Sequence, residues 1–168
     1  MGKQFDWEGF KSEIQGVRFE EGKEFVASRS KDYYWYSPIL DEIFKDKVGD
    51  LVVIPSDQEQ VKKVAAAIAK YKIPLTLRGG GTGNYGQCVP LEGGVIMIMT
   101  KLNRIVEFKE KSVLTESGVR ISRLDDAARD IGLELLMYPS TRLTATIGGF
   151  LAGGSGGCRA CCWQHAQA

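Results

Sequence analysis

The sequence has almost no excess of charge of one sign, with 22 Lys and Arg side chains, 21 Asp and Glu side chains and a formal charge of +1. A balanced chain has no strong field with which to attract nucleic acid or an anionic membrane, so neither is predicted as a partner. No apolar run approaches the length of a membrane span, and the start, MGKQFDWEGF, lacks the apolar centre of a signal peptide. Gly2 resembles a myristoylation start, but Asp6 stands where that motif requires Ser or Thr. These absences predict a cytoplasmic protein without a membrane span.

Cysteine and histidine are also scarce, and most of them lie at the very end: Cys88, Cys158, Cys161, Cys162 and His165. Their uneven spacing disfavours the disulfide framework of a secreted protein and favours reduced thiols. The last four have zinc-ligand side chains, but the adjacent Cys161 and Cys162 point apart, and so short a segment can scarcely wrap one ion. A c-type haem is disfavoured because Cys162, rather than His, follows Cys161. We predict no metal site and assign no catalytic residue.

Hydrophobic residues make up 43% of the chain, enough for one globular core. The run LVVIP, residues 51–55, predicts a buried strand, and IPLTLR, residues 73–78, predicts a second. Between them, Ser56 and Glu59 have the spacing of a capping box at a helix start. The predicted apolar face of that helix consists of Val61, Val64, Ala65 and Ile68. This strand, helix and strand favour a parallel pair with a right-handed crossover.

The second half of the chain continues the alternation of strands and helices. Residues 95–99 predict a strand covered on both faces, and SVLTESGV offers another short strand. A helix follows, with Gly132 as its C-cap and an apolar face made of Ile121, Leu124, Ala128 and Ile131. Residues 133–137, LELLM, predict a last strand. Asp125 and Asp126 face different directions on the helix, so they predict a solvated surface rather than an acid/base pair.

The loop RGGGTGNYG, residues 78–86, is the most informative stretch of the sequence. It lacks the Lys and the hydroxyl residue of a P-loop, and no helix follows it as the dinucleotide fingerprint GxGxxG requires. An anion-binding nest of backbone amides remains, because glycine accepts the positive φ values that such a nest needs. The alternative is a long surface turn. Arg78 could offset phosphate charge or form a surface ion pair at the strand end.

A second loop of the same kind, TATIGG, occupies residues 144–149. It again combines small hydroxyl residues with adjacent glycines. Two such loops, about 60 residues apart, predict one extended ligand held from two sides, which suits a dinucleotide better than a single phosphate.

The ordered motifs PSDQEQV, IPLTLRGGGTG, GGVIMIMTKLNRI, ESGV and PSTRLTATIGG resemble the FAD-linked oxidases of the vanillyl-alcohol oxidase and p-cresol methylhydroxylase superfamily. The likeness covers about residues 51–157 and is greatest to the branch with the flavoprotein subunits of glycolate and D-lactate dehydrogenases. It implies an α+β FAD-binding domain: a lobe with a small parallel sheet and flanking helices, and the start of a second sheet. Residues 1–46, including the aromatic run from Tyr33 to Tyr36, are expected to pack on a partial domain formed by residues 47–157.

The resemblance also implies the residues that bind the cofactor. The glycine loop would wrap the FAD pyrophosphate, and the second loop would line the cofactor from the other side, with Gly118 near it. In some relatives a histidine of the first loop is joined covalently to the flavin; Thr82 takes that place here, so non-covalent FAD is expected. The implied residues are Arg78, Gly79, Gly80, Gly81, Thr82, Gly83, Asn84, Gly118, Pro139, Ala145, Thr146, Gly148 and Gly149.

The implied activity is oxidation of a 2-hydroxy acid or a similar CH–OH donor, a small-molecule substrate of the full-length enzyme. After Gly157 the composition changes abruptly to CRACCWQHAQA, which predicts that residues 158–168 come from a shifted reading frame or a truncated gene. Two alternatives remain open. The chain could be a non-catalytic fragment or interaction module that self-associates through uncovered surface. It could also be a flavin-dependent reductase of the cell-wall precursor type.

Overall fold

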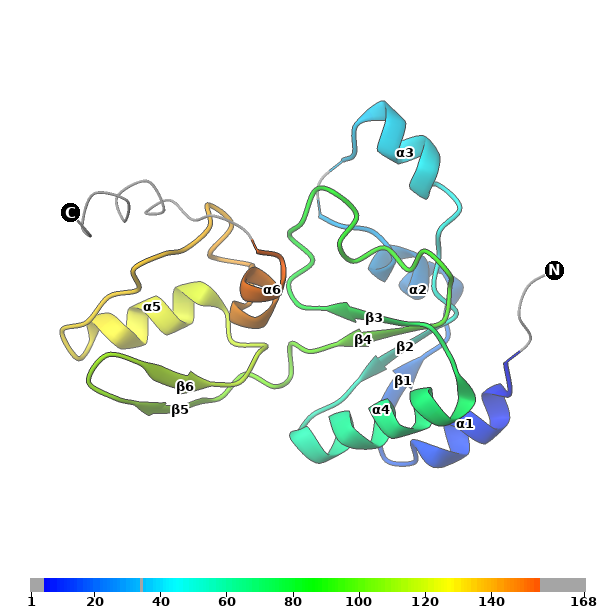
Figure 1. Ribbon diagram of the computed structural model, residues 1–168, viewed down its shortest axis with the longest axis horizontal. Helices are drawn as coiled ribbons and strands as arrows, with labels where there is room; N and C mark the ends of the chain where they lie inside the picture. The colour runs from blue at the N-terminus through cyan, green and yellow to red at the C-terminus, as the bar shows by residue number, and fades with distance from the viewer. Residues whose placement is uncertain (1–4, 34, 155–168) are drawn as a thin grey trace.

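The computed structural model describes residues 5–33 and 35–154, which form two lobes side by side (Figure 1). One lobe contains a four-stranded sheet between helices, and the other contains a two-stranded sheet with two helices. This mixture of helices with a mostly parallel sheet and a second, antiparallel sheet confirms the predicted α+β class. Within the described ranges, no helix has both the length and the apolar composition that crossing a bilayer requires.

The first sheet consists of β1 (Arg18–Glu20), β2 (Leu51–Ile54), β4 (Val95–Ile98) and β3 (Leu75–Arg78), in that spatial order. β2, β4 and β3 are parallel, and β1 pairs antiparallel to β2. The strands predicted near residues 51, 73 and 95 are therefore confirmed. The predicted parallel pair is wrong in one respect, because β4 lies between β2 and β3. All four side chains of β4 are buried, so the most apolar strand takes the centre, where both faces are covered.

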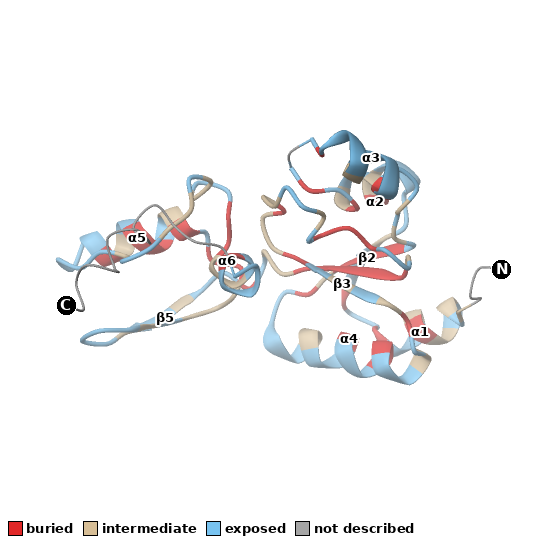
Figure 2. Cartoon of the chain, turned by 45° about the horizontal axis from the view of Figure 1, so that its top comes forward, coloured by how far each residue is buried: buried red, intermediate tan, exposed pale blue. Residues whose placement is uncertain are grey.

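Helices cover both faces of this sheet, and alternate side chains of each strand face opposite layers. α1 (Trp7–Glu13) and α4 (Gln58–Tyr71) lie on one face, and α2 (Lys23–Arg29) lies on the other, with α3 (Pro38–Phe44) above it (Figure 1). Val52, Ile96 and Ile98 pack with Val26 of α2. Figure 2 shows buried residues concentrated along the strands and on the helix sides that face them.

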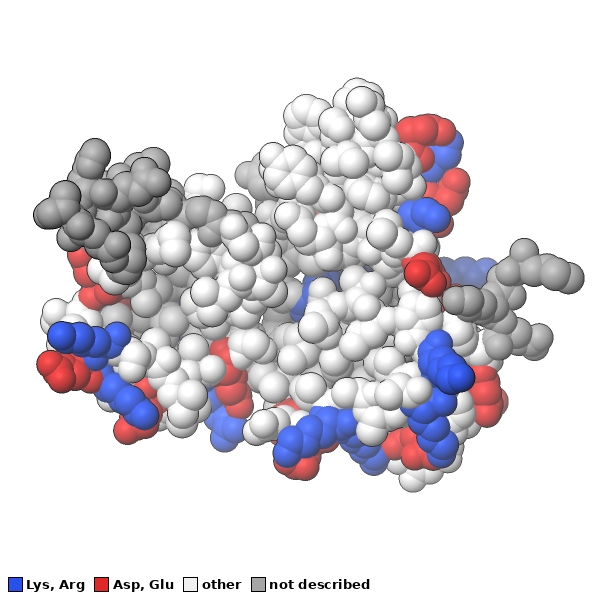
Figure 3. Space-filling model, viewed as in Figure 1, with Lys and Arg blue, Asp and Glu red and all other residues white. Residues whose placement is uncertain are grey.

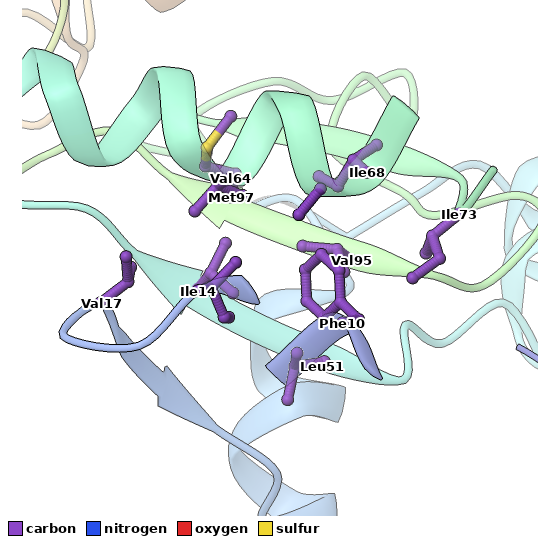
Figure 4. Close-up of a cluster of buried hydrophobic side chains, with 11 residues drawn as sticks. Phe10, Ile14, Val17, Leu51, Val64, Ile68, Ile73, Val95 and Met97 are labelled. Carbon is purple, nitrogen blue, oxygen red and sulfur yellow. The ribbon is translucent and has the colours of Figure 1, made fainter. Parts of the chain in front are cut away.

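The larger core lies between the sheet and the helices α1 and α4, and residues before position 49 are part of it (Figure 4). Phe10 of α1 and Ile14, the C-cap of that helix, are 0% exposed and pack with Leu51, Val64 and Val95. The N-terminal segment thus contributes a strand and two central core side chains, in addition to surface packing.

The helix α4 begins one residue later than the sequence pattern indicates. Asp57, rather than Ser56, is the N-cap, and its side chain accepts a hydrogen bond from the Gln60 amide at 2.8 Å. The Gln60 side chain in turn accepts from the Ser56 amide at 2.9 Å, so Glu59 takes no part. Asp57 and Gln60 have the same three-residue spacing as Ser56 and Glu59, and they make the capping bonds one residue further along, while Glu59 forms an ion pair with Lys62.

The buried face of α4 consists of Val64, Ala67 and Ile68. Val61 is half-buried, and Ala65, which was predicted on this face, is exposed. The helix is rotated slightly from the predicted register, so that Ala67 contacts the core in place of Ala65.

The second lobe contains the hairpin of β5 (Ile105–Phe108) and β6 (Val113–Thr115), with α5 (Ile121–Arg129) and α6 (Ile147–Ala152). β6 confirms the predicted short strand. The strand predicted at residues 133–137 is wrong: that segment is irregular, because no strand of the described chain lies beside it to pair with its backbone.

The helix α5 confirms most of its predicted face. Ile121, Leu124 and Ala128 are buried, whereas Ile131 is 54% exposed, beyond the end of the helix. Gly132 has the predicted capping role: its φ is +76°, and it is followed by a hydrogen bond from the Leu133 amide to the Ala128 carbonyl at 2.9 Å.

Candidate functional site

A cavity of about 570 Å³ opens where the parallel strands β2, β3 and β4 end, between the two lobes. Ile54, Arg78 and Ile98, the last residues of these strands, line it. The carboxyl edge of a parallel sheet is the usual position of a ligand site in such folds, because loops from several strands meet there. From the second lobe the cavity receives Gly118, Arg120, Arg123, Thr144 and Thr146.

The two glycine loops touch one another beside this cavity. A side chain on Gly79 would overlap the Thr146 hydroxyl, and one on Gly80 would overlap the Thr144 carbonyl and lie 3.2 Å from the Cα of Ala145. Glycine is therefore needed at both positions for the two segments to approach. The two loops therefore lie side by side, as they must if they are to hold one ligand between them.

Two further glycines allow close packing between the second loop and the chain that follows β4, one at Gly118 and one at Gly148. The Cα of Gly118 lies so close to the Met99 and Leu102 carbonyls that a Cβ would overlap them, and its amide donates to Leu102 at 2.8 Å. Gly148 approaches Ser117 in the same way, with a Cβ that would lie 2.6 Å from the Ser117 Cβ. Gly118 thus lines the cavity at the join between the lobes.

The first loop presents backbone donors that the protein itself does not use. The amides of residues 79–83 have no hydrogen-bond acceptor among the described residues. Gly81 has a φ of +64°, a left-handed value typical of an anion-binding nest. A run of five unused amides beside a cavity is what an anionic ligand requires.

Cations line the cavity, and the described residues that line it include no Asp or Glu. Figure 3 shows Lys or Arg side chains inside the hollow between the lobes. Arg29 is notable, because its buried Nε has no hydrogen-bond partner in the described part of the chain. The cationic side chains are Arg18, Arg29, Arg78, Lys101, Arg120 and Arg123. Together with the free amides, they make this cavity a site for a polyanion.

Arg78 is 7% exposed, so the surface ion pair considered from the sequence is wrong. Its Nη1 instead donates to the carbonyls of Arg29 and Lys31, at 3.1 and 2.6 Å. Burial lowers the pKa of the guanidinium below its usual value, yet the group remains cationic at neutral pH. Arg78 therefore adds positive charge at the cavity wall and anchors the start of the glycine loop.

The other predicted site residues differ in where they lie relative to the cavity. Gly79, Gly80, Gly118 and Thr146 line the cavity with Arg78. Ala145 is buried under the second loop. Gly148 and Gly149 lie in the first turn of the helix α6, which begins at the N-cap Thr146, rather than in an open loop. The predicted residues that do not line the cavity are Gly81, Thr82, Gly83, Asn84, Pro139, Ala145, Gly148 and Gly149.

The sequence patterns missed the contribution of the N-terminal region to the site. Arg18 of β1 and Phe25 and Arg29 of α2 line the cavity. Asp32 lies behind the glycine loop, with its carboxylate accepting from the amides of Gly86 and Cys88. No local motif marks these residues, since they reach the loop only through folding. That every charged residue among the described lining is cationic is likewise invisible until distant segments meet.

No catalytic group emerges among the described residues. Burial raises the pKa of the Cys88 thiol to about 11, so it is protonated at neutral pH and is a poor nucleophile or metal ligand. The described segments contain no cluster of three potential metal ligands. The cysteines and the histidine considered for zinc, at positions 158–165, lie outside the described residues.

Asp125 corrects a further prediction, because it is 1% exposed rather than solvated, whereas its neighbour Asp126 is exposed. Its carboxylate accepts from Arg129 Nε at 3.0 Å and from the Leu135 amide at 3.3 Å, and Arg142 lies 3.7 Å away. Burial alone would raise its pKa, but these hydrogen bonds and charges outweigh burial and lower it. Asp125 thereby fixes the segment that leads from α5 to the second glycine loop.

We expect Asp125→Asn to lower the free energy of unfolding at pH 7 by about 2 kcal/mol, the scale of hydrogen bonds to a charged group. Because the folded pKa lies below its unfolded value of about 3.9, this contribution is complete above that pH and is lost as pH falls through the folded pKa. Urea denaturation at pH 7 and near pH 3 should show the difference shrinking in acid. Asp126→Asn is the matched control, and equal stability of Asp125→Asn and wild type at pH 7 would refute the prediction.

The known proteins with similar sequences are much longer than this chain. The protein is 33% identical over 144 residues to D-lactate dehydrogenase of Archaeoglobus fulgidus, an alignment covering 85% of this chain and 29% of that protein. It is 32% identical over 109 residues to the glycolate oxidase subunit GlcD of Escherichia coli, covering 64% and 22%. The chain thus spans less than a third of the length of these relatives.

Solved structures share the fold at lower sequence identity. Alkyldihydroxyacetonephosphate synthase superposes with a TM-score of 0.75 at 21% identity, over 93% of this chain and 33% of that one. The 4-ethylphenol oxidase of Gulosibacter chungangensis superposes with a TM-score of 0.61 at 24% identity, over 82% and 27%. These likenesses support the architecture predicted from the motifs.

One family profile matches the sequence, that of the FAD binding domain, and it extends over residues 49–167. The matched range takes in both glycine loops, Gly118 and the strands that carry the cavity. Since the match extends over well more than half of the sequence, the chain belongs to the family of FAD binding domains.

Proposed function

We propose that this chain binds FAD non-covalently in the cation-lined cavity and is the cofactor-binding part of an oxidoreductase acting on 2-hydroxy acids or similar CH–OH donors. One observation carries the proposal: free backbone amides of the first glycine loop stand beside a cavity whose lining, among the described residues, has six cations and no carboxylate. FAD carries its negative charge on a pyrophosphate, which matches amide donors and guanidinium groups.

The residues present fit the cofactor in their donor chemistry. The amides of Gly79 and Gly80, which line the cavity, and the neighbouring free amides of residues 81–83 are donors suited to phosphate oxygens, and Arg29 has a buried Nε without an acceptor among the described residues. Gly79 and Gly80 let the second loop pack against the first, so that both loops lie at the cavity. Thr146 and Gly118 line the cavity from the opposite lobe. The chain's own role is therefore to bind the pyrophosphate and to orient the rest of the cofactor.

The proposal of non-covalent attachment comes from Thr82, which stands where some relatives have a flavin-linked histidine. No histidine occurs in the described part of the chain, and the buried Cys88 thiol is protonated. Attachment by hydrogen bonds and charge is the mode that these residues support.

The substrate class follows from the relatives, whose names, D-lactate dehydrogenase and glycolate oxidase, identify 2-hydroxy acids as their substrates. Bound FAD supplies an acceptor for a hydride from the carbon that bears the hydroxyl. The described residues offer no base in the cavity, since the lining has no Asp, Glu or His. We therefore propose that the group that removes the hydroxyl proton lies elsewhere in the complete enzyme.

Self-association is a second candidate property, favoured by the exposed apolar side chains around α3. Trp35, Ile39 and Ile43 are 84%, 75% and 51% exposed, an unusual concentration for a monomeric surface. Size-exclusion chromatography separates the two cases. A monodisperse flavin-loaded species favours the cofactor-binding role, and a cofactor-free oligomer favours an interaction module.

The test of the proposed function is reconstitution of the purified full chain with FAD. We expect saturable binding at one FAD per chain, seen as a change in flavin absorbance and fluorescence, and weakened by pyrophosphate or by high salt. Acid precipitation should release all the flavin to the supernatant if attachment is non-covalent. Folded protein that does not bind FAD at micromolar concentration would overturn the proposal.

A further inference from the structure

The glycine loop is held in place from behind by residues 29–33, which we call the N-terminal brace. These residues run from the last residue of α2 onward and lie upstream of the range matched by the family profile, which begins at residue 49. Four contacts join the brace to the loop. The Tyr33 amide donates to the Gly81 carbonyl at 2.7 Å, and Arg78 donates to the carbonyls of Arg29 and Lys31. The fourth contact is the carboxylate of Asp32.

Asp32 makes the most specific of these contacts. It is 8% exposed, and its two oxygens accept from different amides, Gly86 at 2.8 Å and Cys88 at 3.1 Å. Its own amide donates to the hydroxyl of Tyr36 at 2.8 Å, and Tyr36 is itself buried against Phe44. Asp32 is therefore held by Tyr36 through its backbone amide, and its carboxylate holds the amides of Gly86 and Cys88 in place.

The glycine loop needs such support because its own hydrogen bonds do not determine its shape. The amides of residues 79–83 have no acceptor among the described residues, and glycine restricts the backbone least of all residues. The contacts from the brace reach Arg78 at the start of the loop, Gly81 within it, Gly86 at its end and Cys88 just beyond. The unused amides are thus oriented from outside the loop.

We propose that Asp32 is a positioning residue for the cofactor site, which holds the glycine loop in the conformation that presents its amides to the FAD pyrophosphate. The inference rests on the proposed function. Asp32 does not line the cavity, so it acts through the backbone of the loop rather than by touching the ligand. The cofactor site consequently extends into the region before the matched domain.

The test compares Asp32→Asn with wild type, using the full chain. Asparagine keeps the size of the side chain but leaves one oxygen, so one of the two amide bonds and the charge are lost. We expect the Kd for FAD to rise about tenfold, the usual scale for losing one hydrogen bond to a charged group. The ³¹P resonances of the bound pyrophosphate should shift from their wild-type positions, whereas a merely structural role would leave them unchanged.

The matched control is Asp46→Asn, the same chemical change at an exposed position with no hydrogen bond to the loop. It should leave FAD binding unchanged. Hydrogen exchange of residues 79–88 in the cofactor-free protein gives a second measurement, with faster exchange expected in Asp32→Asn and wild-type exchange in Asp46→Asn.

The outcomes separate this inference from the proposed function. Wild type that binds FAD, together with an Asp32→Asn variant of equal affinity or unaltered loop exchange, would overturn the inference alone. Wild type that does not bind FAD would overturn both. Weaker FAD binding with faster loop exchange, in a variant that still melts cooperatively, supports the positioning role.

Discussion

Gly80→Ala is expected to weaken FAD binding about thirtyfold, the equivalent of about 2 kcal/mol of strain from overpacking. The added methyl group would overlap the Thr144 carbonyl, which belongs to the second glycine loop and cannot swing aside as a side chain would. The two loops must separate, and the amides and cations around the cavity then lose their common geometry. Titration of the full chain with FAD, followed by fluorescence, measures the change.

Gly22→Ala is the matched control for this substitution. Gly22 has a φ of −60°, and its added Cβ would lie 3.9 Å from its nearest neighbour, an ordinary contact. The control should bind FAD as wild type does. If Gly80→Ala binds FAD as tightly as Gly22→Ala, the contact between the two loops is not needed for the site.

Phe10→Ala is expected to lower the free energy of unfolding by about 3–5 kcal/mol, as for other fully buried aromatic side chains. The ring is 0% exposed and makes edge contacts with Trp7 and Tyr71, at centroid distances of 6.0 and 6.4 Å. Its removal leaves a cavity between α1, α4 and the sheet, which the rigid strands cannot fill. Since the free energy of unfolding of a native protein is only about 5–15 kcal/mol, the variant should be near the limit of folding.

Phe19→Ala provides the comparison, because Phe19 lies on β1 and is 37% exposed. We expect Phe19→Ala to lower the free energy of unfolding by about 1 kcal/mol, because the side chain is only partly buried. Urea denaturation of both variants, monitored by tryptophan fluorescence, gives the two values. If both substitutions lowered the free energy of unfolding equally, α1 would be packed on the surface of the domain rather than forming part of its core.

The sequence predicts best those features in which neighbouring residues suffice. The apolar run at residues 95–98 predicts a strand buried on both faces, and Gly132 predicts the end of α5. The glycines at 79 and 80 predict a loop that something approaches closely, and the second loop, at Thr144 and Thr146, is what touches them.

The features that escaped prediction depend on residues far apart in the chain. The Gly86 amide bonds to Asp32, 54 positions earlier, and no local pattern distinguishes that aspartate from a solvated one. Asp125 looks like a surface residue until Arg129, Arg142 and Leu135 surround it. The segment LELLM has the composition of a strand, but backbone pairing needs a neighbouring strand, which composition does not supply.

The insertion of β4 between β2 and β3 has a consequence for the order of folding. During synthesis, β2, α4 and β3 emerge first, but the two strands cannot pair with one another in their final positions, because each pairs with β4. A gap one strand wide remains until residue 98 has left the ribosome. Until then the nascent chain displays two unpaired apolar edges, the surface that chaperones bind and that aggregates extend. The glycine loop, which lies between β3 and β4, is therefore shaped only when the last strand closes the sheet.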